Sequence, residues 1–176
     1  VMFGPNASLD LGGSFRVSTA DYLRMGENER FYALPHTNDL LSVAAPAAFG
    51  FLDGDVAPIE IEGRGEITEQ AWEDHPTGLR VSEGKNIMLA GGDISIGNGT
   101  YFTAVVRDES GEPVLDGNGR PVTGTEQPGE LKAPAGRISQ CAVRSSGEVR
   151  LTKADPILTD FTRTGDVTLS ENAVLD

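Results

Sequence analysis

The residues that could carry chemistry are few and scattered along the chain. The two histidines, His36 and His75, each stand beside a proline with no second His or Cys at metal-ligand spacing, so we expect plain surface residues. Asp53 and Asp55 flank a glycine, and on a strand their carboxylates would share one face, as a metal site or an acid pair requires. Because Asp-Gly favours positive φ, we expect a turn there instead.

Other candidate sites fail on spacing. The segment Asp116–Gly119 begins like an EF-hand loop, but the fifth and sixth positions, which need an oxygen ligand and a glycine, are Arg120 and Pro121. The chain contains no Gly-x-Ser-x-Gly, Gly-x-x-x-x-Gly-Lys or Gly-x-Gly-x-x-Gly motif. Cys141 has only Arg144 nearby to lower its thiol pKa, so we expect a small packing residue. The sequence therefore predicts no cofactor, no metal and no enzymatic activity.

Charge and composition disfavour two classes of partner. The chain of 176 residues has 14 basic and 27 acidic side chains, and its net charge of −13 repels phosphate backbones and anionic lipid surfaces. A single cysteine allows no intrachain disulfide. No apolar run is long enough to span a membrane, and the first residues do not resemble an export signal. We expect no nucleic-acid partner, no membrane insertion, and one partial domain over residues 1–176 that begins upstream.

Short strands are the elements that must position any site. Five segments share a pattern in which a glycine and a polar residue precede alternating β-formers. They are Gly84–Leu89, Gly92–Ile96, Gly136–Ile138, Gly147–Leu151 and Gly165–Leu169. The last two begin 18 residues apart, a separation typical of solenoids. Stacked coils would join the apolar faces of such strands into one interior, so the sequence predicts an all-β chain folded as a parallel β-helix.

Two stretches interrupt this pattern. Residues 108–130 are polar around Asp116–Gly119, and we expect a hairpin that protrudes from the solenoid. Residues 67–76 end at Pro76, and we expect a surface excursion with one helical turn and Trp72 folded onto the coil. A β-sandwich is the alternative, since Asn98-Gly99 and Asp116-Gly117 fit hairpin loops, but two such sites against five repeated segments rank it second.

Four stretches, in order along the chain, are similar to one protein family. They are Phe3–Phe15, Phe31–Ala33 with Leu40–Leu52, Leu89–Ile96 and Ala133–Ile138. Together they resemble the two-partner secretion (TPS) domain, or haemagglutination-activity domain, of filamentous haemagglutinin-like exoproteins. The Asn-Pro-Asn-Gly hallmark and the capping segment of that family would fall before Val1.

The resemblance implies a right-handed parallel β-helix that acts in protein export and needs no cofactor. A dedicated outer-membrane transporter would recognise the domain in an extended state and guide a large adhesin-like exoprotein through the periplasm and outer membrane of a Gram-negative-type bacterium. The folded protein would be secreted or held at the cell surface, where it would mediate cell adhesion to a host or neighbouring cell. The family positions carried over, for structure or transporter recognition, are Phe3, Gly4, Asn6, Gly12, Gly13, Phe15, Gly91, Gly92 and Asp93.

Two other functions suit the same fold, because a fold does not determine a function. A β-helix polysaccharide lyase or hydrolase would need acids from neighbouring coils in one outer groove. Asp93, Glu148 and Asp166 each follow a glycine and could align outside, although their regular placement suits a solvated row of turns. A direct surface-binding adhesive solenoid would carry exposed aromatic residues, for which Tyr101 and Phe102 are the candidates.

Overall fold

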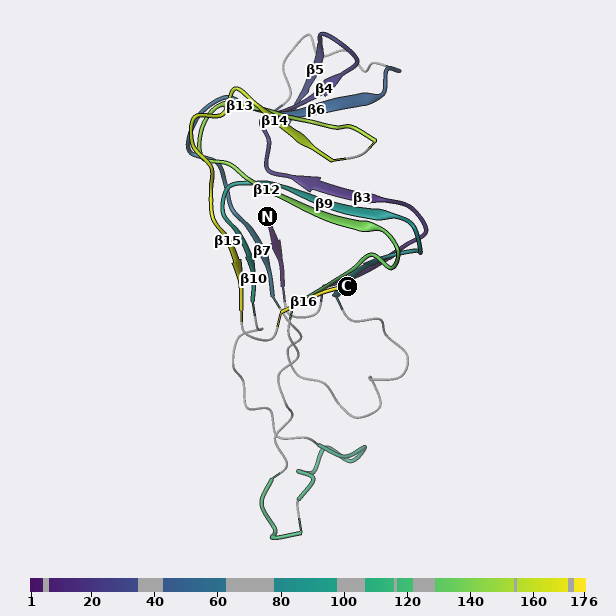
Figure 1. Ribbon diagram of the computed structural model, residues 1–176. Coiled ribbons are helices and arrows are strands. Elements are labelled where there is room, and N and C mark those ends of the chain that lie inside the picture. The colour runs from purple at the N-terminus through teal and green to yellow at the C-terminus, as the bar shows by residue number, and fades with distance from the viewer. Residues whose placement is uncertain are drawn as a thin grey trace.

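A computed structural model describes residues 1–4, 7–34, 43–62, 78–97, 107–115, 117–121, 129–153, 155–170 and 173–176. Every regular element in these ranges is a β-strand, which confirms the all-β class. None of the described segments forms a helix of the length and apolarity needed to cross a membrane. The strands form three parallel sheets of four, four and three strands and one antiparallel sheet of five (Figure 1).

The three parallel sheets are built by successive passes of the chain. Sheet A contains β1 (Met2–Phe3), β7 (Ile59–Ile61), β10 (Ile94–Ile96) and β15 (Val167–Leu169). Sheet B contains β2 (Ser8–Leu11), β8 (Gly78–Val81), β11 (Glu130–Lys132) and β16 (Val174–Leu175). Sheet C contains β3 (Phe15–Ser18), β9 (Asn86–Gly91) and β12 (Arg137–Ala142). Each of the first three passes supplies one strand to each sheet in turn, and the fourth supplies β15 to sheet A and β16 to sheet B. The sheets lie on three sides of a common interior (Figure 1).

In-register pairing stacks apolar side chains into columns inside this body. In sheet A, Ile94 pairs with Ile59 on one side and with Val167 on the other. In sheet B, Leu131 pairs with Leu79, and both side chains are buried. Because side chains alternate along a strand, parallel in-register pairs place like residues directly above one another. Full burial of each such Ile or Leu contributes roughly 1.5–3 kcal/mol, so these columns are a main source of stability.

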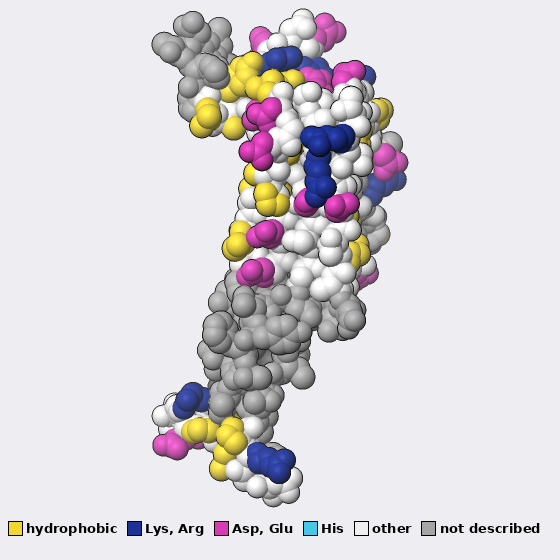
Figure 2. Space-filling view, turned by 90° about the vertical axis from the view of Figure 1, so that its left-hand side faces the viewer, with side chains coloured by type: hydrophobic (Ala, Val, Ile, Leu, Met, Phe, Trp, Pro, Cys, Tyr) yellow, Lys and Arg dark blue, Asp and Glu magenta, His cyan; other side chains and the backbone are white. Residues whose placement is uncertain are grey.

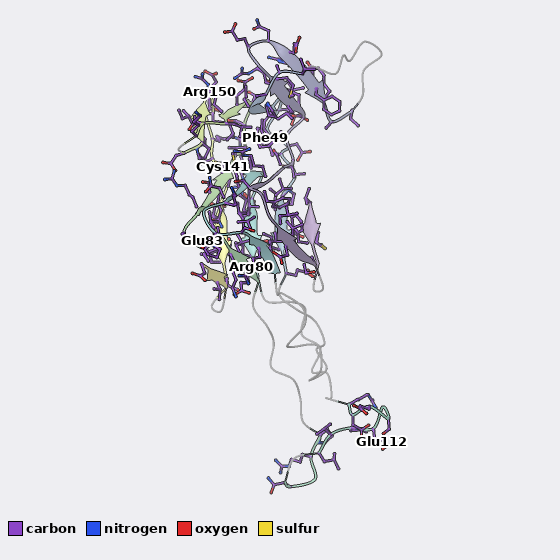
Figure 3. The ribbon with its side chains drawn as sticks, turned by 90° about the vertical axis from the view of Figure 1, so that its right-hand side faces the viewer. Phe49, Arg80, Glu83, Glu112, Cys141 and Arg150 are labelled. Carbon is purple, nitrogen blue, oxygen red and sulfur yellow. The ribbon has the colours of Figure 1, made fainter. Side chains whose placement is uncertain are left out.

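The antiparallel sheet D creates a second hydrophobic core. It contains β4 (Tyr22–Met25), β5 (Glu29–Tyr32), β6 (Pro46–Phe51), β13 (Gly147–Arg150) and β14 (Ile157–Thr159), in the order β14-β13-β6-β4-β5. Phe51 and Val149 on one face of sheet D pack with Met88, Ala90 and Cys141 of sheet C. These three side chains alternate with those that enter the main interior, so sheet C is covered on both faces. Figure 3 shows Phe49 of β6 just above Cys141 of β12.

The repeated glycine segments form strands as expected, but they do not make one regular series. The segments after Gly84 and Gly136 pair as β9 and β12, and those after Gly92 and Gly165 pair as β10 and β15. The segment after Gly147 is β13 of the antiparallel sheet, so the 18-residue separation from Gly165 is not a coil length. The alternation requires only that one face of a strand is buried. For β13, which pairs with β6, that face packs into the second core.

The polar segment predicted as a hairpin contains two small antiparallel turns. Arg107 bridges Pro113, and Leu115 bridges Pro121. These residues lie apart from the four sheets, with Glu112 at the far end in Figure 3. Glu130, the last residue of the predicted segment, is the first residue of β11.

Several other predictions concern residues outside the described ranges. They are those on Asn6, His36, residues 67–76 with Trp72 and His75, Asn98-Gly99, and Tyr101 and Phe102.

Candidate functional site

Phe3 and Phe15, two of the family positions, form a contact within the first pass of the chain. Phe3 ends β1 and Phe15 begins β3, and their rings meet edge to face with centroids 6.3 Å apart and planes at 78°. Both rings pack against the main core. An aromatic pair of this geometry contributes about 0.5–1.5 kcal/mol beyond the burial of its surface. In the folded protein, these two residues therefore hold sheets A and C together.

Gly12 and Gly13 occupy an exposed bend between β2 and β3. A Cβ atom on either residue would meet no atom within 4 Å, and neither has the positive φ that would favour glycine. Gly4 is equally open, and its carbonyl oxygen accepts a hydrogen bond from the Ala7 backbone at 2.9 Å. The folded body therefore gives no steric reason for glycine at these three positions.

Gly91 and Gly92 lie at the corner between sheets C and A, where backbones of different passes touch. A Cβ on Gly92 would lie 2.2 Å from the carbonyl oxygen of Val56, well inside contact distance. The Gly92 N–H donates to the Ala57 carbonyl at 2.9 Å. A Cβ on Gly91 would lie 2.9 Å from the Ile59 side chain. Glycine at this corner has a packing role, because any side chain would push two passes of the chain apart.

Asp93 continues this corner with an electrostatic contact between passes. Its carboxylate accepts a short hydrogen bond from the Arg144 guanidinium and another from the Asp166 backbone at 3.0 Å. Arg144 also lies 3.2 Å from the Asp166 carboxylate. The guanidinium, and then the Asp166 N–H, hold the pKa of Asp93 below its usual value. On the face shown in Figure 2, basic side chains adjoin acidic ones in the same way.

Glu148 does not join Asp93 and Asp166 in an outer row. It lies on β13 in sheet D, where its carboxylate accepts hydrogen bonds from the Tyr22 hydroxyl at 2.9 Å and from Arg24 Nε at 3.1 Å. The expected row assumed that β13 stacks in the same series as β10 and β15. Because β13 pairs antiparallel with β6 instead, its acid is carried to a different part of the molecule. The three carboxylates therefore form no common groove.

Sequence reasoning did not find the polar network on the outer face of sheet D. Tyr22 is only 5% exposed, and its ring lies over Gly50, where a Cβ would fall 1.9 Å from the ring. The Arg30 guanidinium covers the same ring, 4.3 Å from its centroid. Burial, and then Glu148, raises the pKa of Tyr22. The sequence signal for this network was the spacing of two residues between Tyr22 and Arg24 and between Arg30 and Tyr32, on either side of a short Gly-containing turn. This spacing would place the four side chains on one face of a hairpin.

The remaining candidate residues take simple structural roles. The Asp55 N–H donates to the Asp53 carboxylate at 3.0 Å, which closes a bend in this segment, although Gly54 does not have the positive φ that was expected. Cys141 is buried in the second core, and burial raises the pKa of its thiol to about 11. Across the described ranges, no three His, Cys, Asp or Glu side chains are grouped so that they could hold a metal ion.

Comparison of the chain with protein-family models, with curated proteins and with solved structures gives no match in any of the three.

Proposed function

We propose that this chain is the secretion-targeting domain of a large bacterial adhesin-like exoprotein, exported by the two-partner pathway and not enzymatic. In this proposal the three parallel sheets form a right-handed parallel β-helix. Right-handed winding is what physical chemistry favours, because parallel crossover connections are right-handed in nearly all known sheets. The partner is an outer-membrane transporter of the two-partner pathway, and the folded domain is released outside the cell or held at its surface.

The observation that carries the proposal is the order of strands in the parallel sheets. In sheets A, B and C the spatial order follows the chain order, so each pass of the chain is added to the edge left by the pass before it. A chain that emerges from a transporter with its N-terminus first could therefore fold stepwise outside the membrane. Each new strand gains its hydrogen bonds and its apolar contacts from a strand already in place.

The contacts of the acidic residues support a binding role over a catalytic one. Asp93 and Asp166 are engaged by Arg144, and Glu148 is engaged by Tyr22 and Arg24. A polysaccharide lyase or hydrolase needs carboxylates that are free to exchange protons with a substrate. The acids that sequence analysis proposed for that alternative are held by neighbouring side chains instead.

The family positions divide into two groups by their surroundings. Phe3, Phe15, Gly91, Gly92 and Asp93 make contacts that stabilise the folded body. Gly4, Gly12 and Gly13 make none that require glycine, and of these Gly12 and Gly13 are exposed. We therefore assign transporter recognition to the bend that contains Gly12 and Gly13, where a substitution leaves the packing of the folded domain unchanged.

Secretion is the experiment that tests this function. The domain, fused to an export signal and to the hallmark and capping segment of the family, is produced with and without a cognate outer-membrane transporter, and the culture medium is assayed for the protein. We expect release only when the transporter is present. Release without the transporter, or retention in its presence, would overturn the proposal.

Matched glycine variants locate the recognition segment. Gly12→Asp adds a charged side chain in open space, and we expect it to reduce transporter-dependent release while the purified protein keeps its thermal stability. Gly117→Asp makes the same change at another open position, in the polar segment, and should leave release unchanged. Equal release of both variants would exclude recognition at the Gly12 bend.

A further inference from the structure

The outward face of sheet D carries two rows of side chains that run across the strands. One row contains Arg30, Arg24, Ala48 and Arg150, which are matched from β5 through β4 and β6 to β13. The other row contains Tyr32, Tyr22, Gly50 and Glu148, matched across the same four strands. The residues between these positions along each strand point the other way, and Phe49 and Val149 among them pack into the second core.

This face concentrates positive charge on a strongly acidic protein. It carries three guanidinium groups against one carboxylate, whereas the whole chain has a net charge of −13. Glu148 is paired with Arg24. Among the described residues, no carboxylate lies within ion-pair distance of Arg30 or Arg150, and both side chains are exposed. Two of the three positive charges therefore remain available to an anionic ligand.

Arg24 and Arg30 are held in place, although their mutual repulsion costs stability. Arg24 and Arg30 lie directly opposite each other on β4 and β5, and like charges in that position destabilise a sheet. Arg30 is positioned by the Tyr22 ring, which is itself fixed by the hydrogen bond from its hydroxyl to Glu148. Arg150 projects from β13, two strands from Arg24, so the two backbones lie about 10 Å apart. The face therefore presents separated cationic groups, of which Arg24 and Arg30 are oriented by neighbouring side chains.

We propose that this face of sheet D binds a linear acidic glycan, with uronic-acid carboxylates paired to Arg30 and Arg150. The planar guanidinium fork matches a carboxylate in a bidentate geometry. A folded protein partner is disfavoured, because the centre of such an interface is apolar, whereas the centre of this face consists of Ala48 and of Gly50 beneath the covered Tyr22 ring.

This site goes beyond the proposed secretion role and is independent of it. Secretion concerns the passage of the extended chain, whereas glycan binding concerns the folded protein after release. A protein that is exported but does not bind the glycan would lose only this proposal. A protein that binds the glycan but is exported without the transporter would lose only the secretion proposal.

Binding to immobilised polygalacturonate, measured on the purified folded chain, tests the site. We expect the wild-type chain to bind and to be released by increasing salt, as a charge-dependent contact must be. The double variant Arg30→Gln with Arg150→Gln should raise the dissociation constant about tenfold or more. The single variant Arg150→Gln, which leaves the Tyr22 contact intact, should raise it by a smaller factor.

Arg80 provides the matched control for these arginine substitutions. It is exposed on β8 and has no ion pair with a described carboxylate, and Figure 3 shows it far from Arg150 on the body of the molecule. Arg80→Gln should bind like the wild type. An equal loss for Arg80→Gln, unchanged binding of the double variant, or no binding by the wild type would overturn the proposed site. Competition by poly-glutamate as strong as by free polygalacturonate would overturn the glycan in favour of an acidic peptide.

Discussion

The hydroxyl of Tyr22 donates a hydrogen bond to the Glu148 carboxylate at 2.9 Å, joining two residues that lie 126 positions apart in the chain. The same carboxylate receives Arg24 Nε at 3.1 Å, and the side chains of Arg24 and Glu148 are only 16% and 20% exposed. This contact fixes the β4–β5 hairpin to a strand from the last third of the sequence.

Loss of the Glu148 carboxylate should destabilise the protein. Glu148→Ala leaves the Arg24 guanidinium largely buried without its charge partner, and we expect a loss of roughly 2 kcal/mol in the free energy of unfolding. Tyr22→Phe removes one hydrogen bond and keeps the ring, so it should cost about 1 kcal/mol. Urea unfolding followed by circular dichroism measures both values. Equal stability of Glu148→Ala and wild type would show that the network contributes nothing.

Gly92 should not tolerate even the smallest side chain. In Gly92→Ala the new Cβ would lie 2.2 Å from the Val56 carbonyl oxygen, which forces the backbone of neighbouring passes apart. We expect a loss of about 3 kcal/mol. The control is Gly12→Ala, where the new Cβ meets no atom within 4 Å, and its effect should stay within about 0.5 kcal/mol. Thermal melting of the two variants side by side distinguishes a packing requirement from general sensitivity to glycine replacement.

The Asp93–Arg144 contact should make part of the stability depend on pH. The pKa of Asp93 is lower in the folded protein than its ordinary value, so its contribution is complete above about pH 4, where the unfolded chain is also ionised. The contribution is lost as the pH falls through the folded value. Asp93→Asn should lack this component. The loss of stability between pH 7 and pH 3 should therefore be smaller in the variant than in the wild type. Identical pH profiles for the two proteins would exclude the contact as a source of acid sensitivity.

Cys141 should be unreactive while the protein is folded. Burial raises the pKa of its thiol to about 11, so only a small fraction is thiolate at pH 8. We expect slow modification by a disulfide reagent such as 5,5′-dithiobis(2-nitrobenzoate) in buffer, and rapid modification in denaturant. Rapid reaction in buffer, with the circular dichroism spectrum unchanged, would place the thiol outside the second core.

The sequence predicted the class of the fold through its alternation of apolar residues. Ile87 and Leu89, and likewise Ile94 and Ile96, alternate with a period of two and are fully or almost fully buried. The sequence also indicated the turn at Asp53 and the packing role of Cys141, because both depend on neighbouring residues or on residue type alone.

The same sequence reasoning failed wherever the partner of a strand mattered. Val149 and Val167 stand in equivalent repeats, yet Val149 pairs with Phe49 in the antiparallel sheet and is fully buried, while Val167 pairs with Ile94 and is 44% exposed. Alternation fixes which side chains share a face, but it does not specify which strand lies alongside. That choice depends on the total burial and hydrogen bonding of the whole body.

By itself, then, the sequence determined that the chain forms short strands with one buried face, held without disulfides and with excess negative charge. Only the tertiary structure decided that Glu148 meets Tyr22 and Arg24, that Asp93 meets Arg144, and that the arginines of sheet D share one face. The physical reason is that local patterns are set by residues a few positions apart. Contacts between distant residues are set by strand register, which becomes fixed only when the sheets assemble.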